Sequence, residues 1–419
     1  GRTSGATVRH GGYHPAVRTR SAPVGILLAA GLVAACGPAQ HVPAEASAEP
    51  APAAPGAPFV GPDACLPCHE DKVRAFERSA HRNTSALPSD ATILGSFEPG
   101  ANTLITGGGR TRFTMERRGG AFFQAATMER DRSETVRRFD VVFGSGKLGQ
   151  TYAYWSGSEL YQLPVSYLAS EDAWMNSPGD RYAGGTSEFI RPSVPARVEC
   201  HTTRIQPEPG TLNTYRPETL VPGVTCERCH GPAGEHVRHH RAHPGALAAH
   251  AIVHPADLPR ERALDLCGQC HGGVGNLLRP PFTYRPGEPL AEHLEQPPPP
   301  EPGAEGVHSS NQLPRLRLSR CFQASPSLSC ATCHDPHVVE RGRTREFSAR
   351  CLSCHQVEQC GAAHGAAAAA DPAGPPADPA GNCIDCHMPL IPSASTTIRS
   401  GGDVLRPPVR DHRIAVPGR

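Results

Sequence analysis

The chain repeats one short arrangement of residues that can bind a metal-containing cofactor. Two cysteines stand three positions apart, and a histidine directly follows the second cysteine. The arrangement occurs six times, whereas a shuffled sequence of the same composition would contain it about 0.03 times. The six copies are Cys65, Cys68 and His69; Cys226, Cys229 and His230; Cys267, Cys270 and His271; Cys330, Cys333 and His334; Cys351, Cys354 and His355; and Cys383, Cys386 and His387.

This spacing has the chemistry of c-type haem attachment. Two thiols about one helical turn apart can add to the two vinyl groups of one haem, and the next histidine then lies under the iron as its proximal ligand. The main alternative is zinc, because paired C-x-x-C sequences also build zinc sites. Zinc sites do not require a histidine directly after every pair, but every pair here has one. The sequence therefore favours six haem c groups, held by twelve cysteines and six proximal histidines.

The composition fits a chain that is organised by cofactors. Only 38% of its 419 residues are hydrophobic and 5% are aromatic, which is little for conventional cores of this size. Haem adds apolar surface, and its covalent and axial bonds constrain the chain. The formal net charge of +1 gives no strongly basic balance, so we expect no nucleic-acid partner.

The N-terminal residues have the pattern of an export signal. Arg18 and Arg20 precede an apolar run, residues 24 to 35, that is too short to span a bilayer but suits a signal peptide. The run ends in Leu-Val-Ala-Ala-Cys, which resembles a bacterial lipobox with Cys36 as the lipidated residue. The alternative is an ordinary cleaved signal with an incidental cysteine. We expect an exported protein, in the periplasm or anchored to the outer membrane of a Gram-negative-type bacterium.

The remaining chain divides by composition. Runs rich in aromatic and β-branched residues, separated by glycine-containing turns, predict strands over 110–116, 121–127, 136–143, 151–156 and 159–168. Gly144 to Lys147 predicts a hairpin turn, and Trp155 and Trp174 are expected to close one face of this meander over the haem body. Short helices are predicted over 71–79, 260–267 and 345–351.

These patterns predict a multihaem cytochrome c fold. Mainly short α-helices and coil wrap around covalently bound haems, with an inserted antiparallel β meander. The predicted parts are a signal peptide with lipobox (1–36), an Ala/Pro-rich tether (37–58), a first haem segment (59–100), a β-rich insert (101–195) and a multihaem cytochrome c domain (196–415).

The second axial ligand of each iron decides what the haems can do. A haem with histidine on both faces only passes electrons, whereas one with an open face can bind a substrate. Four histidines that follow one another closely, His239, His240, His243 and His250, resemble ordinary surface residues. Six others stand where the chain can return to a haem and are the candidate distal ligands: His81, His236, His254, His308, His337 and His412.

Three cysteines remain outside the motifs and the lipobox. Residues 197 to 201 read Arg-Val-Glu-Cys-His, which is the motif with its first cysteine replaced, so Cys200 is the candidate for a seventh haem. Alternatively, His201 is an axial ligand or a structural residue. Cys321 and Cys360 flank haem motifs in an exported protein, and we expect a disulfide between them.

Several segments resemble a known family. They are "CERCHGPAGEHV", "HPADLPRERALDLCGQCH", "SRCFQASPSLSCATCHDPH", "ARCLSCH", "CIDCHMP" and "DHRI", which together span about residues 60–415. The chain resembles bacterial multihaem c-type cytochromes related to the tetrahaem cytochromes that carry electrons from hydroxylamine oxidation. The resemblance implies distal ligands at His236, His254, His337 and His412. Arg197 departs from it, because a fully cysteine-paired motif is expected there.

The leading hypothesis is an electron carrier, not an enzyme, with closely spaced bis-histidine haems and redox proteins as its partners. The alternative is a reductase of a small nitrogen or sulfur oxyanion at one open-faced haem, to which Tyr161, Tyr167 and Arg191 could contribute. A third interpretation is a haem-bearing sensor or structural lipoprotein.

Overall fold

The computed structural model describes residues 58–178, 189–297, 307–360, 381–394, 396–400 and 403–416. The predicted signal peptide with Cys36 and almost all of the tether lie outside these residues. Within the described part of the chain, no helix is both long and apolar enough to cross a membrane.

Short helices carry all six haem motifs. The helices predicted over 71–79, 260–267 and 345–351 are confirmed with shifted ends, as α1, α5 and α9. The helices are η1 (Pro62–Ala64), α1 (Leu66–Phe76), α2 (Pro195–Val198), α3 (Cys226–His230), α4 (Gly234–Ala242), η2 (Pro255–Asp257), α5 (Arg260–His271), η3 (Leu290–Glu292), α6 (Gln312–Arg317), α7 (Arg320–Ala324), α8 (Cys330–Cys333), α9 (Thr344–Leu352), η4 (Val357–Cys360) and α11 (Cys383–His387).

The predicted β-rich insert forms two antiparallel sheets. The four-stranded sheet has the order β2 (Thr103–Thr106), β3 (Thr111–Arg118), β4 (Ala121–Met128) and β5 (Glu134–Arg138). The seven-stranded sheet contains β1 (Ser85–Ala86), β6 (Val141–Phe143), β7 (Gly149–Ser156), β8 (Glu159–Gln162) and β11 (Arg191–Pro192), with β9 (Val165–Leu168) and β10 (Ala173–Asn176) branching from β7.

The single five-stranded meander of the prediction is therefore too simple. The run over 136–143 divides into β5 and β6, because the Asp140 carboxylate accepts hydrogen bonds from Trp155 N and Arg138 Nε at the break. The run over 159–168 divides at Pro164, which has no N–H to donate to a neighbouring strand. As a result β5 pairs with β4, whereas β6 pairs with β7 in the other sheet.

The hairpin predicted at residues 144–147 is confirmed. Strands β6 and β7 pair with Phe143 opposite Thr151. Gly144 has φ 103°, and a Cβ there would lie 2.6 Å from the carbonyl oxygen of Gly149. Only glycine fits this backbone without displacing the opposite strand.

The insert has an aromatic core of its own. Trp174 is 4% exposed, packs with Phe97, Phe139 and Tyr152, and donates from Nε1 to the Ser96 carbonyl at 2.7 Å. Trp155 packs in a second cluster with Tyr215. Both tryptophans are core residues, as expected, but they lie inside the β part and do not line the cavity of the haem motifs.

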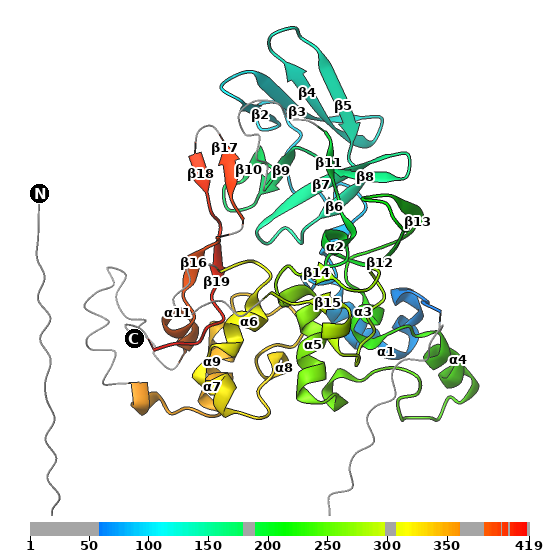
Figure 1. Cartoon of the computed structure of the whole chain (residues 1–419), viewed down its shortest axis with the longest axis vertical. Coiled ribbons are helices and arrows are strands. Elements are labelled where there is room, and N and C mark those ends of the chain that lie inside the picture. The colour runs from blue at the N-terminus through cyan, green and yellow to red at the C-terminus, as the bar shows by residue number, and fades with distance from the viewer. Residues whose placement is uncertain are drawn as a thin grey trace, which may run out of the picture. The chain divides into compact units, whose positions relative to one another are not determined.

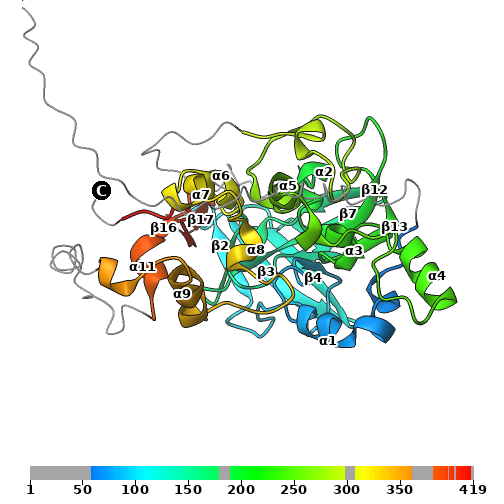
Figure 2. The ribbon, with the colours of Figure 1, turned by 90° about the horizontal axis from the view of Figure 1, so that it is seen from below.

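Four short two-stranded sheets lie outside the insert. They are β12 (Thr202–Pro207) with β13 (Tyr215–Pro222), β14 (Asn276–Leu277) with β15 (Leu294–Glu295), β16 (Leu390–Pro392) with β19 (Pro408–Arg410), and β17 (Ile398–Ser400) with β18 (Asp403–Leu405). Figures 1 and 2 show the helices that carry the motifs along one side of the insert, in a row from α1 and α3 through α5 to α8, α9 and α11.

The Gly223 backbone joins the two segments that flank the first two motifs. Gly223 has φ 72°, and a Cβ there would lie 2.0 Å from the Arg82 carbonyl oxygen.

We expect Gly223→Ala to lower the free energy of unfolding by at least about 2 kcal/mol, because the Arg82 backbone must move. Gly157→Ala is the matched control: its φ is 62° but its Cβ meets nothing within 4 Å, so the cost is about 1 kcal/mol. Urea unfolding followed by circular dichroism measures both, and equal losses would contradict this account.

Candidate haem-binding site

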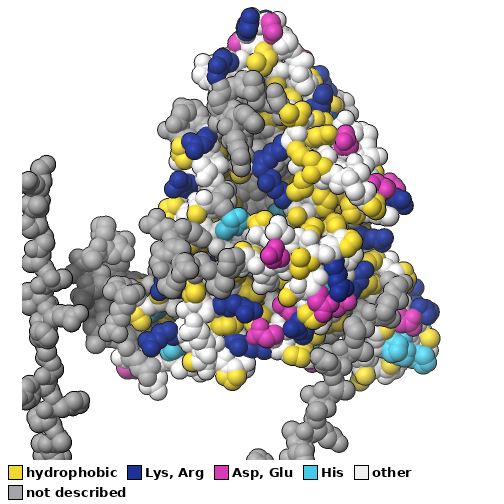
Figure 3. Space-filling model, viewed as in Figure 1, with side chains coloured by type: hydrophobic (Ala, Val, Ile, Leu, Met, Phe, Trp, Pro, Cys, Tyr) yellow, Lys and Arg dark blue, Asp and Glu magenta, His cyan; other side chains and the backbone are white. Residues whose placement is uncertain are grey.

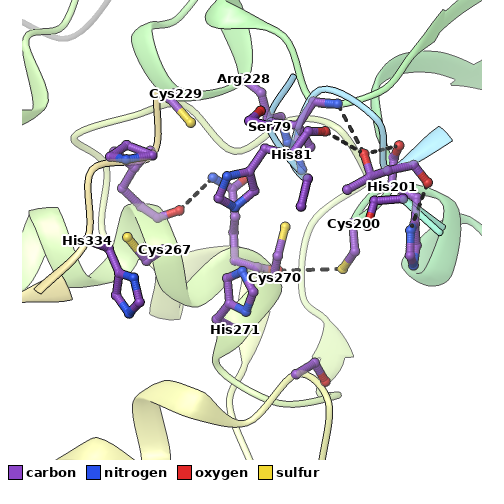
Figure 4. A pocket seen from close by; sticks show the side chains of 18 of the residues that line it. Ser79, His81, Cys200, His201, Arg228, Cys229, Cys267, Cys270, His271 and His334 are labelled. Atoms are coloured by element: carbon purple, nitrogen blue, oxygen red, sulfur yellow. Dashed lines mark hydrogen bonds between the residues drawn. The ribbon is translucent and has the colours of Figure 1, made fainter. Parts of the chain in front are cut away.

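One large cavity runs through the helical body. Its volume is about 2970 Å³, and it is lined by the cysteines and histidines of the first four motifs and by all six predicted distal histidines. Cys351 of the fifth motif and Ile384 of the sixth reach it as well. The predicted ligands of the first four motifs and the predicted distal histidines therefore surround one continuous space, part of which Figure 4 shows.

Within a motif, one turn of helix brings the ligands together. The backbone N–H of the histidine bonds to the carbonyl of the first cysteine, at 3.0 Å for His69 and Cys65 and 2.9 Å for His334 and Cys330. This bond closes a turn, so the two thiols share a face and the imidazole follows directly beneath them. The geometry is that required to hold one haem by two thioether bonds and one axial nitrogen.

Thiols of different motifs also meet. The Cys65 thiol hydrogen-bonds to Cys226, which raises the pKa of Cys65 and lowers the pKa of Cys226 to about 7. The same contact joins two further pairs of motifs, through Cys267 with Cys330 and Cys351 with Cys383. Arg228 of the second motif hydrogen-bonds to Cys270 of the third. Rings attached at these thiols would be immediate neighbours.

Four motif histidines face a histidine from another part of the chain. In each pair one ring belongs to a motif and the other is a predicted distal ligand. The distances between ring centres are 6.4 Å for His69 with His236, 6.2 Å for His230 with His337, 6.1 Å for His271 with His81, and 6.3 Å for His334 with His412.

These distances fit an iron between the rings. Two metal–imidazole bonds of about 2.0 Å, with about 1.15 Å from each nitrogen to its ring centre, separate the centres by about 6.3 Å. Ring pairs within the histidine cluster of α4 are closer, at 3.9 Å for His239 with His250 and 4.6 Å for His239 with His243. Figure 4 shows His81 and His271 directed toward one another across the cavity.

Hydrogen bonds at the second ring nitrogen leave the first one available. Nδ1 of His230 lies 2.9 Å from the Val253 carbonyl, and Nδ1 of His387 lies 2.8 Å from the Ala415 carbonyl. A carbonyl only accepts, so Nδ1 carries the proton and Nε2 has a free lone pair for a metal. Further oxygens hold Nδ1 of His236, His271, His337 and His412 at 3.0–3.1 Å.

Burial favours the neutral form of several of the paired histidines. Burial lowers the pKa of His81 and of His412 to about 4, and burial likewise lowers the pKa of His271. A neutral imidazole is the form that binds a metal.

The other two predicted distal histidines differ from these four. Nδ1 of His308 accepts a hydrogen bond from the backbone N–H of Ser310 at 3.0 Å, which places the ring proton on Nε2. The His254 side chain is 59% exposed, and its Nδ1 lies 3.3 Å from Asp257. Both line the cavity, but neither forms a ring pair of this kind with a described residue.

The histidines predicted to lie at the surface form a cluster on and after α4. His243 and His250 are exposed, whereas His239 and His240 are half-buried and His240 lines the cavity. Figure 3 shows histidine side chains gathered at this end of the face in view.

Of the cysteines outside the motifs, Cys200 lines the cavity with His201, and Cys321 has a free thiol. The Cys360 side chain, the other half of the predicted disulfide, lies outside the described residues.

Three supporting residues carry no signal in the sequence. Gln312 Oε1 lies 3.0 Å from His271 Nδ1, and Glu340 lies 3.4 Å from His334 Nδ1. Asp411, beside His412, forms a buried ion pair with Arg315. Spacing could not identify Gln312, because it is 41 residues from His271 in the chain. Glu340 and Asp411 are two of 40 acidic residues, and spacing does not distinguish them from the others.

Comparison with known proteins agrees with this chemistry. The family model described as cytochrome c554 and c-prime matches residues 181–231, which include Cys200, His201 and the motif at Cys226. The matched segment covers 51 of the 419 residues, and the chain is similar to this family there. A search of curated proteins finds no match for this chain. The crystal structure of the outer cell wall cytochrome OcwA is similar, with a TM-score of 0.49 and 17% identity over 85% of this chain and 79% of that one. The relation to hydroxylamine oxidation stays a prediction.

The ion pair beside His412 can be tested by stability. Burial alone would raise the pKa of Asp411, but hydrogen bonds from Arg315 and Arg413 N outweigh it and hold the pKa below its usual value. Asp411→Asn leaves Arg315 buried without its partner, so we expect a loss of about 3–5 kcal/mol in the free energy of unfolding at pH 7.

The stability that the Asp411 carboxylate contributes should depend on pH. The carboxylate stabilises the protein above the unfolded pKa of about 4, and the contribution disappears as pH falls through the lower folded value. The difference between wild type and Asp411→Asn in urea unfolding should therefore shrink below pH 4. Asp90→Asn, at an exposed pair with Arg117, is the control and should cost at most about 1 kcal/mol. A constant difference down to pH 2 would contradict the assignment.

Proposed function

We propose that this protein is a multihaem c-type cytochrome that is exported and transfers electrons. At least six haems would form one continuous row in it. Bound haem supplies reversible one-electron chemistry at iron. The observation that carries the proposal is the set of four facing histidine pairs at 6.1–6.4 Å, each of which would saturate an iron and leave it no place for a substrate.

Contacts between successive motifs support the row. Thiol pairs link the first motif to the second, the third to the fourth and the fifth to the sixth. Arg228 links the second to the third, and Arg350 of α9 donates to the Cys333 carbonyl and so links the fourth to the fifth. Electrons would therefore pass between neighbouring rings from the α1 end to the α11 end.

The chain itself holds the rings in register. His81, from the segment after the first motif, serves the third, and His337, from the segment after the fourth, serves the second. His236 and His412 complete the first and the fourth. Each distal ligand thus ties one haem to the segment that belongs to another, and hydrogen bonds at Nδ1 fix the ring orientation.

Location and partners follow from the N-terminal sequence. The signal-like run before Cys36 supports export and a lipid anchor in the membrane, and redox proteins are the proposed partners at the two ends of the row. A near-neutral formal charge of +1 speaks against nucleic acid.

The axial assignments predict the spin states of individual haems. His81→Ala, His236→Ala, His337→Ala and His412→Ala should each convert one low-spin ferric signal to high spin in low-temperature EPR, because each removes one nitrogen ligand. His243→Ala is the matched control, since that exposed residue directly follows the helix that carries His236. Four unchanged spectra would refute the assignment.

The electron-carrier role predicts reversible electrochemistry. A film of the matured protein on an electrode should show oxidation and reduction waves of equal charge, without a catalytic current when nitrite, hydroxylamine or sulfite is added. A sustained catalytic current with one of these compounds would establish the alternative, a reductase with one open-faced haem. Absence of any waves would exclude electron transfer.

A further inference from the structure

The Cys200–His201 pair takes no part in the six motifs but repeats much of their construction. Residues 197–201 match the motif except for Arg197, and the chain also winds into a turn there, closed by a bond to the third residue back where the motifs use the fourth. Helix α2 continues beyond Val198 through hydrogen bonds from Glu199 N to Pro195 O at 2.8 Å and from His201 N to Val198 O at 3.0 Å. Cys200 and His201 are thereby placed one after the other on a helical turn, like the last two residues of a haem motif.

The His201 ring is held as the motif histidines are held. Its Nδ1 lies 3.3 Å from the Thr84 carbonyl, which fixes the proton on Nδ1 and leaves Nε2 as a lone-pair donor. The same carbonyl contact orients His230 and His387.

The Cys200 thiol also follows the pattern of the motif thiols. It hydrogen-bonds to Cys270 of the third motif, as Cys65 does to Cys226 and Cys267 does to Cys330. Figure 4 shows Cys200 and His201 beside the cavity that also receives Cys270 and His271. A ring attached at Cys200 would therefore be a direct neighbour of the third haem.

The cavity extends beyond this pair toward the β insert. Its walls there are Phe143 and Thr151 of the β6–β7 hairpin, Tyr167 of β9, and Val194 at the start of α2. The Phe143 ring lies 5.9 Å from the His201 ring and nearly perpendicular to it, which gives an apolar surface next to the imidazole. None of these four residues belongs to a motif.

We propose that Cys200 and His201 bind a seventh haem through a single thioether bond, with His201 as the proximal ligand. The Cys200 S–H adds across one vinyl group: sulfur bonds to the carbon next to the ring, and hydrogen goes to the terminal carbon. Nothing leaves, and no oxidant or reductant is consumed. The second vinyl group stays intact, because Arg197 has no thiol. The inference rests on the proposed function, and it adds a branch from the third haem toward the β insert.

Peptide mapping of the native holoprotein tests the proposal without any mutation. Trypsin cuts after Arg197 and Arg204, which releases residues 198–204 with Cys200 as their only cysteine. After unfolding and treatment with iodoacetamide, this peptide should carry the mass of one haem. A carbamidomethyl group on Cys200 would overturn the proposal. If the six motif peptides also lacked haem, the proposed function would fail with it; if they carried haem, only the seventh site would be lost.

Two variants and a control give a second readout. Cys200→Ser should lower the haem count per chain by one in pyridine haemochrome assays and in intact mass. Arg197→Cys should keep seven haems and shift the haemochrome α band of that one haem to shorter wavelength, because its remaining vinyl group becomes saturated. Cys321→Ser, at another half-buried thiol outside the motifs, should leave the count unchanged. An unchanged count in Cys200→Ser would overturn the proposal.

Discussion

The arrangement of this protein depends on pairs of histidines that meet across a fixed distance from remote parts of the chain. His81 precedes the insert and faces His271 beyond it, and His412 near the C-terminal end faces His334. A metal held between two such rings would crosslink segments that are far apart in the chain. Bond lengths would then set the separation of about 6 Å, and the helices around it would have little freedom to shift.

This constraint explains why the two parts of the molecule are stabilised differently. The β insert buries Phe113, Met115, Tyr152 and Trp174 in a conventional core. The helical body has only small apolar clusters, such as the one around Leu264 and Leu313, beside a cavity of about 2970 Å³. In the proposed multihaem structure, the cofactors would supply most of its apolar interior and would tie the ends of its short helices.

The second ring nitrogens connect ligand geometry to electron transfer. Nδ1 contacts with the carbonyls of Val253 and Ala415 hold the imidazoles of His230 and His387 in one orientation. In the proposed electron carrier, rigid ligands would change little when the iron changes charge, and burial would tune the potential of each haem. The ion pair of Arg315 and Asp411 helps to orient His412 indirectly, because it holds the backbone next to that residue.

Local chemistry was readable from the sequence. Covalent spacing within five residues predicts the thioether cysteines and proximal histidines. The turn at Gly144 follows from its glycines, and α1, α5 and α9 follow from their periodicity. Tertiary structure decided the rest. Which distal histidine faces which motif depends on contacts over long separations. His308, unlike His81, accepts a hydrogen bond from Ser310 and pairs with no motif histidine among the described residues. The division of the sheets at Asp140 and Pro164 depends on which strand each half finds as a partner. The spacing of residues within a short segment determines which of them can hold one cofactor together. Which distant histidine meets a motif depends on tertiary packing, which involves many segments at once.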